Sequence, residues 1–394
     1  MTRRIYMDNA ATTPVAPEVL EEMLPYFTRV GDNASSIHSC GREARSVVEA
    51  ARRTIAACIG AKPSEVYFTS GGTESDNWGI KGTAFEMKEK GKNHIITSAI
   101  EHHAVLHTCQ WLEKQGFTVT YIPVDGDGLV DPEAVEAAIT DRTGLISIMA
   151  ANNEIGTLEP VAEIGRIAAA HHVLFHCDAV QAAGAVPIDV NAWHVDMLSM
   201  SAHKFHGPKG VGVLFIRSGV KLNNLLHGGA QERGKRATTE NVPGIVGMAA
   251  ALKRAVDHMA ESSARETRLR DKLIRGILDS IPYSRLNGHP EKRLPGNVNV
   301  SVPYIEGEAL LLRLDLAGIA ASSGSACTSG SLDPSHVLLA IGLPHEIAHG
   351  SLRLSLSDMT TEEEVNEVLR VLPGIVSTLR AMSPLYEDFL KEGK

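Results

Sequence analysis

A lysine lies directly beyond an apolar segment, where folding could remove it from water. Residues 197–200 are Met-Leu-Ser-Met, Ser201, His203 and Lys204 follow, and a glycine- and proline-rich loop comes next. Burial disfavours the ammonium form of a lysine, and the neutral amine that remains can form a Schiff base with a carbonyl group. The hydroxyl of Ser201 and the imidazole of His203 are suitable donors for an anion bound nearby. Taken alone, such a stretch is more often a solvated strand end than a binding site.

Polar residues follow other apolar segments in the same way. Gly72 and Thr73 follow residues 66–69 and open a helix, where free N–H groups and the helix dipole favour a phosphate. His102 opens the next helix, whose positive end keeps an imidazole neutral. Asn153 follows a later segment and can hydrogen-bond a carboxylate or a phenolic oxygen. One at a time, these residues are better explained as a helix cap, a capping histidine and an asparagine-rich turn.

A carboxylate completes this series of residues. Asp178 ends a further apolar segment, and Gln181 comes three residues later. A buried aspartate needs a partner, and a protonated pyridine nitrogen is one that would turn the ring into an electron sink; a structural salt bridge is the alternative. Phosphate donors, histidine, carboxamide, carboxylate and lysine thus occur in order at the ends of successive segments. Their joint arrangement is far more specific than any one member and predicts a site for pyridoxal phosphate.

Three more features could bind or carry a ligand. The loop 228–241 combines glycines, cations and hydroxyls, among them Thr239, and is either a second anion contact or a flexible basic surface. Cys327 lies in a run of serines and glycines that has little to bury, so its thiol is poorly placed for packing and well placed to carry a group between two sites. An incidental exposed cysteine is the alternative. Arg353 interrupts an apolar alternation and would clamp a carboxylate if it faced a cleft.

The elements that must position these residues alternate between β-rich and helical patterns. Strands are predicted at Val66–Thr69, His94–Ser98, Thr118–Pro123, Leu145–Ala150, Val173–Cys177, Asp196–Met200 and Val211–Ile216. Helices are predicted at Thr73–Lys90, His102–Gln115, Pro132–Ile139 and Val161–His171. This alternation predicts an α/β fold with a mainly parallel seven-stranded sheet and helices on both faces. Ligands of such sheets bind beyond the carboxyl ends of the strands, where the residues above lie.

The pattern changes after a long helical region at about residues 245–280. The remainder predicts a smaller α+β part, with strands at Asn297–Val302, Gly318–Ser322 and Ser351–Leu356 and helices at Glu306–Leu316 and Thr361–Leu372. Thr361 and Glu364 match a capping box, and Pro373 is expected to kink or end the last of these helices. We therefore predict a large cofactor-binding domain at 15–259 and a small domain, formed by 1–14 and 260–394, that carries Cys327.

Composition narrows the class of protein. The 394 residues suffice for two domains, and the formal net charge of −9 without a basic block argues against nucleic acid. The start of the sequence lacks the apolar core of a signal peptide, and no apolar run is long enough for a bilayer, so we expect a cytoplasmic protein without a membrane partner. Five cysteines without a C-x-x-C pair support neither disulfides nor zinc. His103 and His107 lack a third ligand, so no metal is expected.

The segments described above, taken together, resemble those of the cysteine desulfurases, which are pyridoxal-phosphate enzymes of fold type I in the class-V aminotransferase family. The resemblance runs nearly from end to end, and its last motif is most like the nitrogen-fixation (NifS) type. The matching motifs are Tyr6-Met-Asp-Asn-Ala-Ala-Thr-Thr-Pro14, Ser70-Gly-Gly-Thr-Glu-Ser, Glu101-His102, Asn152-Asn153-Glu-Ile-Gly, Asp178-Ala-Val-Gln181, Ser201-Ala-His-Lys204 and Ser322-Ser-Gly-Ser-Ala-Cys327-Thr-Ser-Gly.

The resemblance implies a role for each residue that binds the cofactor. Lys204 would hold it covalently, Asp178 would pair with the pyridine nitrogen, and Gln181 would contact the ring oxygen. His102 would stack on the ring and move protons. The phosphate would be held by Gly72, Thr73, Ser201 and His203, together with Thr239 of the other subunit of a homodimer. The family's usual glycine before that threonine is Thr238 here, which would be strained at a positive φ.

The resemblance also implies the reaction and its partners. Asn153 and Arg353 would hold the carboxylate of L-cysteine, and Cys327 would accept its sulfur as a persulfide while L-alanine leaves. An iron–sulfur scaffold protein would receive the sulfur. The rival functions are a selenocysteine lyase, an aminotransferase that does not use Cys327, and a sulfur carrier or scaffold-binding protein without catalysis.

Overall fold

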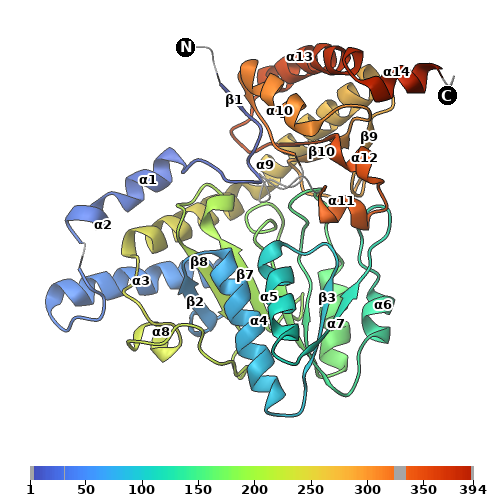
Figure 1. The fold of residues 1–394 in the computed structure, drawn as a ribbon. Coiled ribbons are helices and arrows are strands. Elements are labelled where there is room, and N and C mark those ends of the chain that lie inside the picture. The colour runs from blue at the N-terminus through green and yellow to red at the C-terminus, as the bar shows by residue number, and fades with distance from the viewer. Residues whose placement is uncertain (1–3, 31, 324–333, 392–394) are drawn as a thin grey trace.

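The computed structural model describes residues 4–30, 32–323 and 334–391. Its largest sheet confirms the predicted seven strands, in the order β2-β8-β7-β6-β5-β3-β4 (Figure 1). β8 is antiparallel to its neighbours β2 and β7, and the other pairs are parallel, so every strand except β8 ends at the same edge of the sheet. The bounds are β2 Val66–Thr69, β3 His94–Ser98, β4 Thr118–Ile122, β5 Thr143–Ser147, β6 Leu174–Asp178, β7 Met197–Ser201 and β8 Gly212–Ile216.

Successive side chains of the strands face two different helical layers. Leu145 and Met197 pack in the core that contains α4 (Gly72–Lys88) and α5 (His103–Glu113), which cross in front of the sheet in Figure 1. The next residues, Ile146 and Leu198, join the core on the other face, formed with α3, α7 and the first part of α9. Strands covered on both faces are mainly apolar, which is why short apolar runs predicted them. The second layer has the bounds α3 Ser39–Cys58, α7 Val161–Ala170 and α9 Val242–Ser280.

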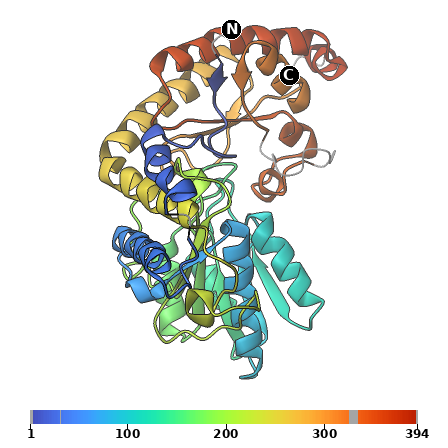
Figure 2. The ribbon, with the colours of Figure 1, turned by 90° about the vertical axis from the view of Figure 1, so that its left-hand side faces the viewer.

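A second lobe surrounds a smaller antiparallel sheet, β12-β10-β9, with bounds β9 Arg285–Leu286, β10 Asn297–Ser301 and β12 Ser351–Ser355. Figure 2 shows the long helix α9 running from one lobe to the other. The start of α9 is buried in the core of the large sheet, and its last turns are buried with the small sheet, α10 (Gly307–Leu316) and α13 (Glu362–Ala381). The predicted boundary at 259/260 falls inside this continuous helix, so the division into domains remains a proposal.

The first residues of the described chain return to the second lobe. β1 (Ile5–Tyr6) pairs in parallel with β11 (Ile319–Ala320), so the predicted strand at 318–322 is real but shorter, and it pairs with β1 instead of joining the three-stranded sheet. The other elements are α1 Pro17–Met23, α2 Pro25–Thr28, η1 Pro63–Glu65, α6 Pro132–Ala137, η2 Ala202–Lys204, α8 Gln231–Gly234, α11 His336–Ala340, α12 His345–His349 and α14 Pro384–Lys391.

The predicted start of α13 is confirmed, and the predicted end is wrong. The hydroxyl of Thr361 accepts a hydrogen bond from the Glu364 N–H at 3.2 Å, and the Glu364 carboxylate accepts one from the Thr361 N–H at 2.9 Å. The helix continues through Pro373, because Leu372 and Val376 on either side of the proline are buried in the same core. Among the helices of the described ranges, none has the length and apolarity needed to cross a membrane.

One buried carboxyl makes the stability of the large lobe depend on pH. Glu159 is 6 % exposed; its Oε2 accepts a hydrogen bond from the Val130 N–H, and its Oε1 has no partner among the described residues. Burial raises the pKa of Glu159 to about 8, with a smaller contribution from Asp125. A raised pKa in the folded state means that the contribution of Glu159 is complete below the unfolded value near 4.5 and is lost as pH rises through 8.

The Glu159→Gln variant should therefore gain stability relative to the parent as pH rises. We expect the difference in unfolding free energy, variant minus parent, to increase by at least about 1.4 kcal/mol between pH 5 and pH 9, which corresponds to one pKa unit. Urea unfolding at both pH values measures it, with the exposed Glu163→Gln as the matched control. A difference that stays constant across this range would contradict the burial argument.

Candidate active site

A cavity of about 340 Å³ lies where the large sheet ends, and most of the predicted site residues line it. Its volume falls in the usual range for small-molecule sites. The lobes contribute together, since Arg353 of β12 and His336 of α11 face the same space as the strand ends. The predicted residues in the lining are Gly72, Thr73, His102, Asn153, Asp178, Gln181, Ser201, His203, Lys204 and Arg353.

Lys204 is held by the first segment of the chain. It ends the short η2 turn directly after β7, and its Nζ donates hydrogen bonds to the carbonyls of Ala10 at 2.6 Å and Ala11 at 2.9 Å. Nε2 of Gln181 donates to the same Ala10 carbonyl at 3.0 Å. Thr13 fixes the segment, because its N–H and hydroxyl both donate to the His203 carbonyl. The amine is thereby fixed at the wall of the cavity.

Asp178 is the last residue of β6, and its side chain needs a cation. Burial raises the pKa of Asp178, an effect that the charge of Lys204 partly offsets, and one oxygen accepts a hydrogen bond from the Val180 N–H at 2.9 Å. The neighbouring Asp76 is also buried; burial and the charge of Asp178 raise its pKa, and its Oδ1 has no hydrogen-bond partner among the described residues. A protonated ring nitrogen placed against Asp178 would stabilise the ionised form.

Two histidines of the cavity are kept neutral. His102 is the N-cap of α5, and its Nδ1 accepts a hydrogen bond from the Ala104 N–H at 3.1 Å, so the neutral ring carries its proton on Nε2. Burial, together with the charge of Lys204, lowers the pKa of His102 to about 4. Burial and the same charge lower the pKa of His203 to about 4. Nδ1 of His203 lies 3.1 Å from the hydroxyl of Thr12. Both rings can therefore stack on a ligand at neutral pH without adding charge.

The part of the cavity at the start of α4 is suited to an anion. Gly72 opens α4, and a Cβ there would lie 2.7 Å from Cγ2 of Val180, so only glycine lets this helix approach so closely. The helix start places Gly72 and Thr73 beside Ser201 and His203 in the lining. Free N–H groups, hydroxyls and an imidazole at a positive helix end are the donors that a phosphate requires.

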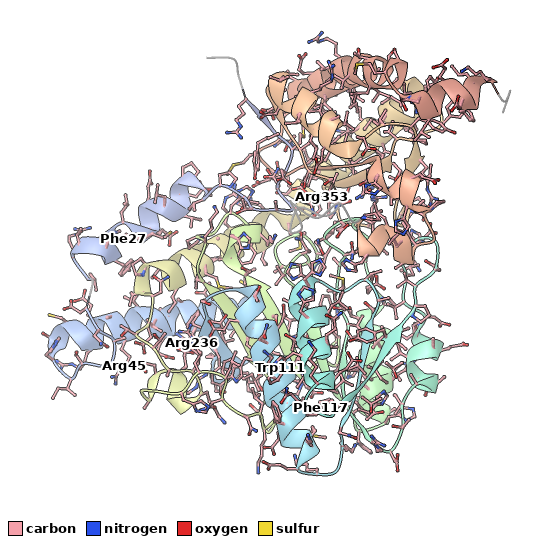
Figure 3. The ribbon with its side chains drawn as sticks, viewed as in Figure 1. Phe27, Arg45, Trp111, Phe117, Arg236 and Arg353 are labelled. Atoms are coloured by element: carbon pink, nitrogen blue, oxygen red, sulfur yellow. The ribbon has the colours of Figure 1, made fainter. Side chains whose placement is uncertain are left out.

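Arg353 enters the cavity from the second lobe. Figure 3 places it at the junction of the lobes, and its side chain is 2 % exposed. Its guanidinium donates to the Asn153 carbonyl at 2.9 Å and to Oδ1 of Asp8 at 3.1 Å, while Nε is buried without a hydrogen-bond partner among the described residues. A buried donor without a partner costs free energy. A ligand carboxylate that accepts a hydrogen bond from Nε would therefore be stabilised here.

The lining also contains residues that the sequence reasoning did not single out. Glu154 lies within the motif Asn152-Asn153-Glu-Ile-Gly and Asp76 directly follows the motif Ser70-Gly-Gly-Thr-Glu-Ser, so these motifs are a signal that could have found both residues. The carboxyl of Glu154 accepts a very short hydrogen bond from the Ser335 hydroxyl, and burial raises its pKa to about 7. Nε2 of His336 donates a hydrogen bond to the Glu101 carbonyl at 3.0 Å. The acceptors Ala10 and Ala11 use main-chain atoms, which no residue type reveals.

Two predicted site residues are not in the lining. Thr239 is exposed, as is expected of a residue that reaches another subunit, and no second subunit tests it. Cys327 lies outside the described residues. Thr238 has a φ of 110°, so the strain expected at this position is present. Within the described ranges, no group of three or more histidine, cysteine or acidic side chains could hold a metal ion.

The residues present fit pyridoxal phosphate. A buried carboxylate, donors for an anion and a lysine amine line one cavity, and they correspond to the pyridine nitrogen, the phosphate and the carbonyl of that cofactor. The close approach of α4 at Gly72 shows that the anion end is built by packing and is not an open surface.

Comparisons with known proteins agree with this assignment. The family model described as Aminotransferase class-V matches residues 5–368. The chain is 60 % identical over 383 residues to "Cysteine desulfurase IscS" of Methanosarcina thermophila, covering 97 % of this chain and 94 % of the relative. It is 57 % identical over 393 residues to the protein of the same name from Clostridium botulinum strain Hall, covering 99 % of both.

Solved structures give the same result. A structure titled "NIFS-LIKE PROTEIN" is 44 % identical with a TM-score of 0.90 and covers 96 % of this chain and 100 % of its own. The structure titled "SspA in complex with cysteine" is 40 % identical with a TM-score of 0.80, covering 91 % of this chain and 100 % of its own. The predicted fold type is thereby confirmed.

The positive φ of Thr238 yields a test of backbone strain. Glycine adopts this conformation freely, whereas a β-branched residue does not, so Thr238→Gly should raise the free energy of unfolding by about 1 kcal/mol. The midpoint of thermal unfolding measures this gain. Thr239→Gly is the matched control, because Thr239 does not have a positive φ, and it should be neutral or destabilising. Equal changes in unfolding free energy at both positions would show that Thr238 is not strained.

Proposed function

This chain belongs to the aminotransferase class-V family, and from that premise we propose how its residues carry out the reaction of a cysteine desulfurase. It is a pyridoxal-phosphate-dependent enzyme that removes sulfur from L-cysteine, leaves L-alanine and supplies the sulfur for iron–sulfur cluster assembly. The observation that supports these assignments most strongly is the cavity at the strand ends, where Lys204, Asp178 and the anion donors converge. The two relatives described above are named IscS, which favours that type over the predicted nitrogen-fixation type.

Three parts of the cavity would hold the cofactor. Lys204 would bind it covalently, Asp178 would pair with its pyridine nitrogen, and Gln181 would contact its ring oxygen, since all three side chains line one space. His102 would stack on the ring. The phosphate would be held by Gly72, Thr73, Ser201 and His203. When bound, pyridoxal phosphate supplies an electron sink for the charge that develops at the substrate Cα.

The chain's own groups would manage the protons. Lys204 lies between two carbonyls and beside neutral histidines, and its freed amine would take the Cα proton of the substrate at Nζ. Asp178 is then needed as an anion, and its buried setting makes the pairing with a cation strong. His102 would donate from Nε2, where its proton lies, because its Nδ1 accepts the hydrogen bond of the Ala104 N–H.

The substrate would be oriented by its carboxylate. Arg353 is buried, its Nε is available, and it contacts Asn153, so the two residues can bind both carboxylate oxygens. The thiolate of Cys327 would attack the substrate sulfur, forming an S–S bond while the bond from sulfur to Cβ breaks and its electron pair remains with carbon. Protonation of the carbon skeleton then yields L-alanine, and Cys327 keeps the sulfur as a persulfide.

The partners proposed for this chemistry are a second copy of the chain and a scaffold protein. Thr239 is exposed in the single chain, which supports a role in the site of another subunit. The persulfide would pass to an iron–sulfur scaffold protein. A cytoplasmic location and a role in nitrogen fixation remain predictions from the sequence.

Substitution of Lys204 tests the cofactor assignment. Lys204→Ala should abolish both the visible absorption of the bound cofactor and alanine formation, because no other residue is proposed to bind the carbonyl. Absorption spectra and alanine assays of the purified protein measure this. Lys209→Ala is the matched control, an exposed lysine in the same loop, and it should retain both signals. A Lys204→Ala protein that keeps its colour and activity would remove Lys204 from the scheme.

Substitution of Cys327 separates cofactor binding from sulfur transfer. Cys327→Ala should retain the visible absorption and lose sulfide release from L-cysteine by at least about a hundredfold, since the attacking thiolate is missing. Cys40→Ala serves as the control, because Cys40 is an exposed cysteine whose loss should not matter. Full sulfide release by Cys327→Ala would exclude the persulfide step.

A further inference from the structure

An ion pair next to the anion end of the cavity has no role in the reaction described above. Nε of Arg236 donates to Oε1 of Glu74 at 2.7 Å, and Nη2 donates to Oε2 at 2.9 Å. The two side chains are 13 % and 12 % exposed. Arg236 lies in the loop between α8 and α9 (Figure 3), far along the chain from the turn that it contacts. A bidentate, largely buried pair of this kind is a strong and directional contact.

Glu74 lies in the turn that would hold the phosphate. It belongs to the first turn of α4, directly after Thr73 of the cavity lining. Its Oε2 also accepts a hydrogen bond from the Ser70 N–H at 2.8 Å, so the carboxylate ties the two ends of the Gly71–Gly72 turn together. Burial would raise the pKa of Glu74, but the hydrogen bonds from Arg236 and Ser70 outweigh burial and lower it. Glu74 is therefore an anion beside the anion site.

A phosphate dianion would be repelled by this carboxylate if the carboxylate were uncompensated. Partly buried charges interact strongly because the surroundings screen them less than water does. The guanidinium of Arg236 cancels the charge of Glu74 without removing the carboxylate's hydrogen bond to the turn. The pair thus keeps the shape of the turn and removes the repulsion between the Glu74 carboxylate and a bound phosphate.

A second anchor fixes the loop that carries Arg236. Glu232 is buried and accepts hydrogen bonds from both terminal nitrogens of Arg52, at 2.7 and 2.8 Å, and from the N–H of Phe68 at 2.9 Å. Arg233 donates to the Val66 carbonyl at 2.8 Å. These contacts attach the loop to β2, the strand that leads directly into the phosphate turn. Arg236 is therefore presented to Glu74 by a rigid support.

We propose that Arg236 is a positioning residue for the cofactor phosphate, acting through Glu74 on the turn 70–74. The inference rests on the proposed function, since it requires that pyridoxal phosphate binds with its phosphate at this turn. The same loop carries Thr238 and Thr239, so Arg236 connects this subunit's phosphate turn with the residues proposed to reach the partner's site.

Binding to the apo-protein tests this role without recourse to activity. Arg236→Gln should weaken the binding of pyridoxal phosphate and of inorganic phosphate by about tenfold, because it leaves the Glu74 charge uncompensated. Binding of pyridoxal, which lacks the phosphate, should be unchanged. Titration calorimetry with these three ligands measures the effect, and Lys235→Gln, an exposed cation next to Arg236 in the same loop, is the matched control.

A double substitution separates charge compensation from simple loop support. Glu74→Gln combined with Arg236→Gln should restore phosphate binding to within about threefold of the parent, since the repulsion is gone. Arg236→Lys should lose less than Arg236→Gln, because it keeps the charge. Equal weakening of pyridoxal and pyridoxal phosphate, or no recovery in the double variant, would overturn the proposal. A parent protein that fails to bind pyridoxal phosphate would instead overturn the proposed function.

Discussion

The amine of Lys204 donates hydrogen bonds to main-chain carbonyls of the N-terminal segment, and this contact joins the two lobes at the site. Ala10 and Ala11 accept its hydrogen bonds, and the segment that carries them continues β1, which pairs with β11 of the second lobe. The segment is held on its other side by hydrogen bonds between Asn9 and Ser355 of β12. Lys204 from the large sheet and Arg353 from the small one are thus placed relative to each other by one short stretch of chain.

The electrostatics of the cavity suit a ligand that has both charges. Burial raises the pKa of Asp178 and of Glu154, and it lowers the pKa of His102 and His203, so the dry walls disfavour charge on every one of these groups. A buried group stays charged only with a partner. A cation would be a partner for Asp178, and an anion would be a partner for the positive start of α4. One molecule that has both charges therefore fits better than either ion alone.

The sequence predicted the large sheet well because its strands are buried on both faces and are therefore apolar runs with polar residues at their ends. The prediction from the sequence failed where tertiary packing overrides local sequence signals. The helix α13 passes Pro373 because its apolar side is buried beyond the proline, and the two-residue strands β1 and β9 are too short to show a period. Contacts through main-chain carbonyls, such as those of Ala10, have no signature in residue types. The predicted residues that line the cavity could be found because the proposed chemistry requires particular side chains at strand ends; their roles stay predictions.

The segment formed by α8 and the loop that follows it shows how strain can be maintained away from the cavity. Glu232, Arg233 and Thr238 all have positive φ values, of 46°, 57° and 110°, and each such residue costs about 1–3 kcal/mol. The hydrogen bonds that Glu232 accepts from Arg52 and from the Phe68 N–H, and the one that Arg233 donates to the Val66 carbonyl, fix this segment to the body of the large lobe. The loop is therefore shaped by the subunit that carries it. A second copy of the chain would meet a preformed surface and would not have to order the loop on binding, which lowers the entropic cost of association.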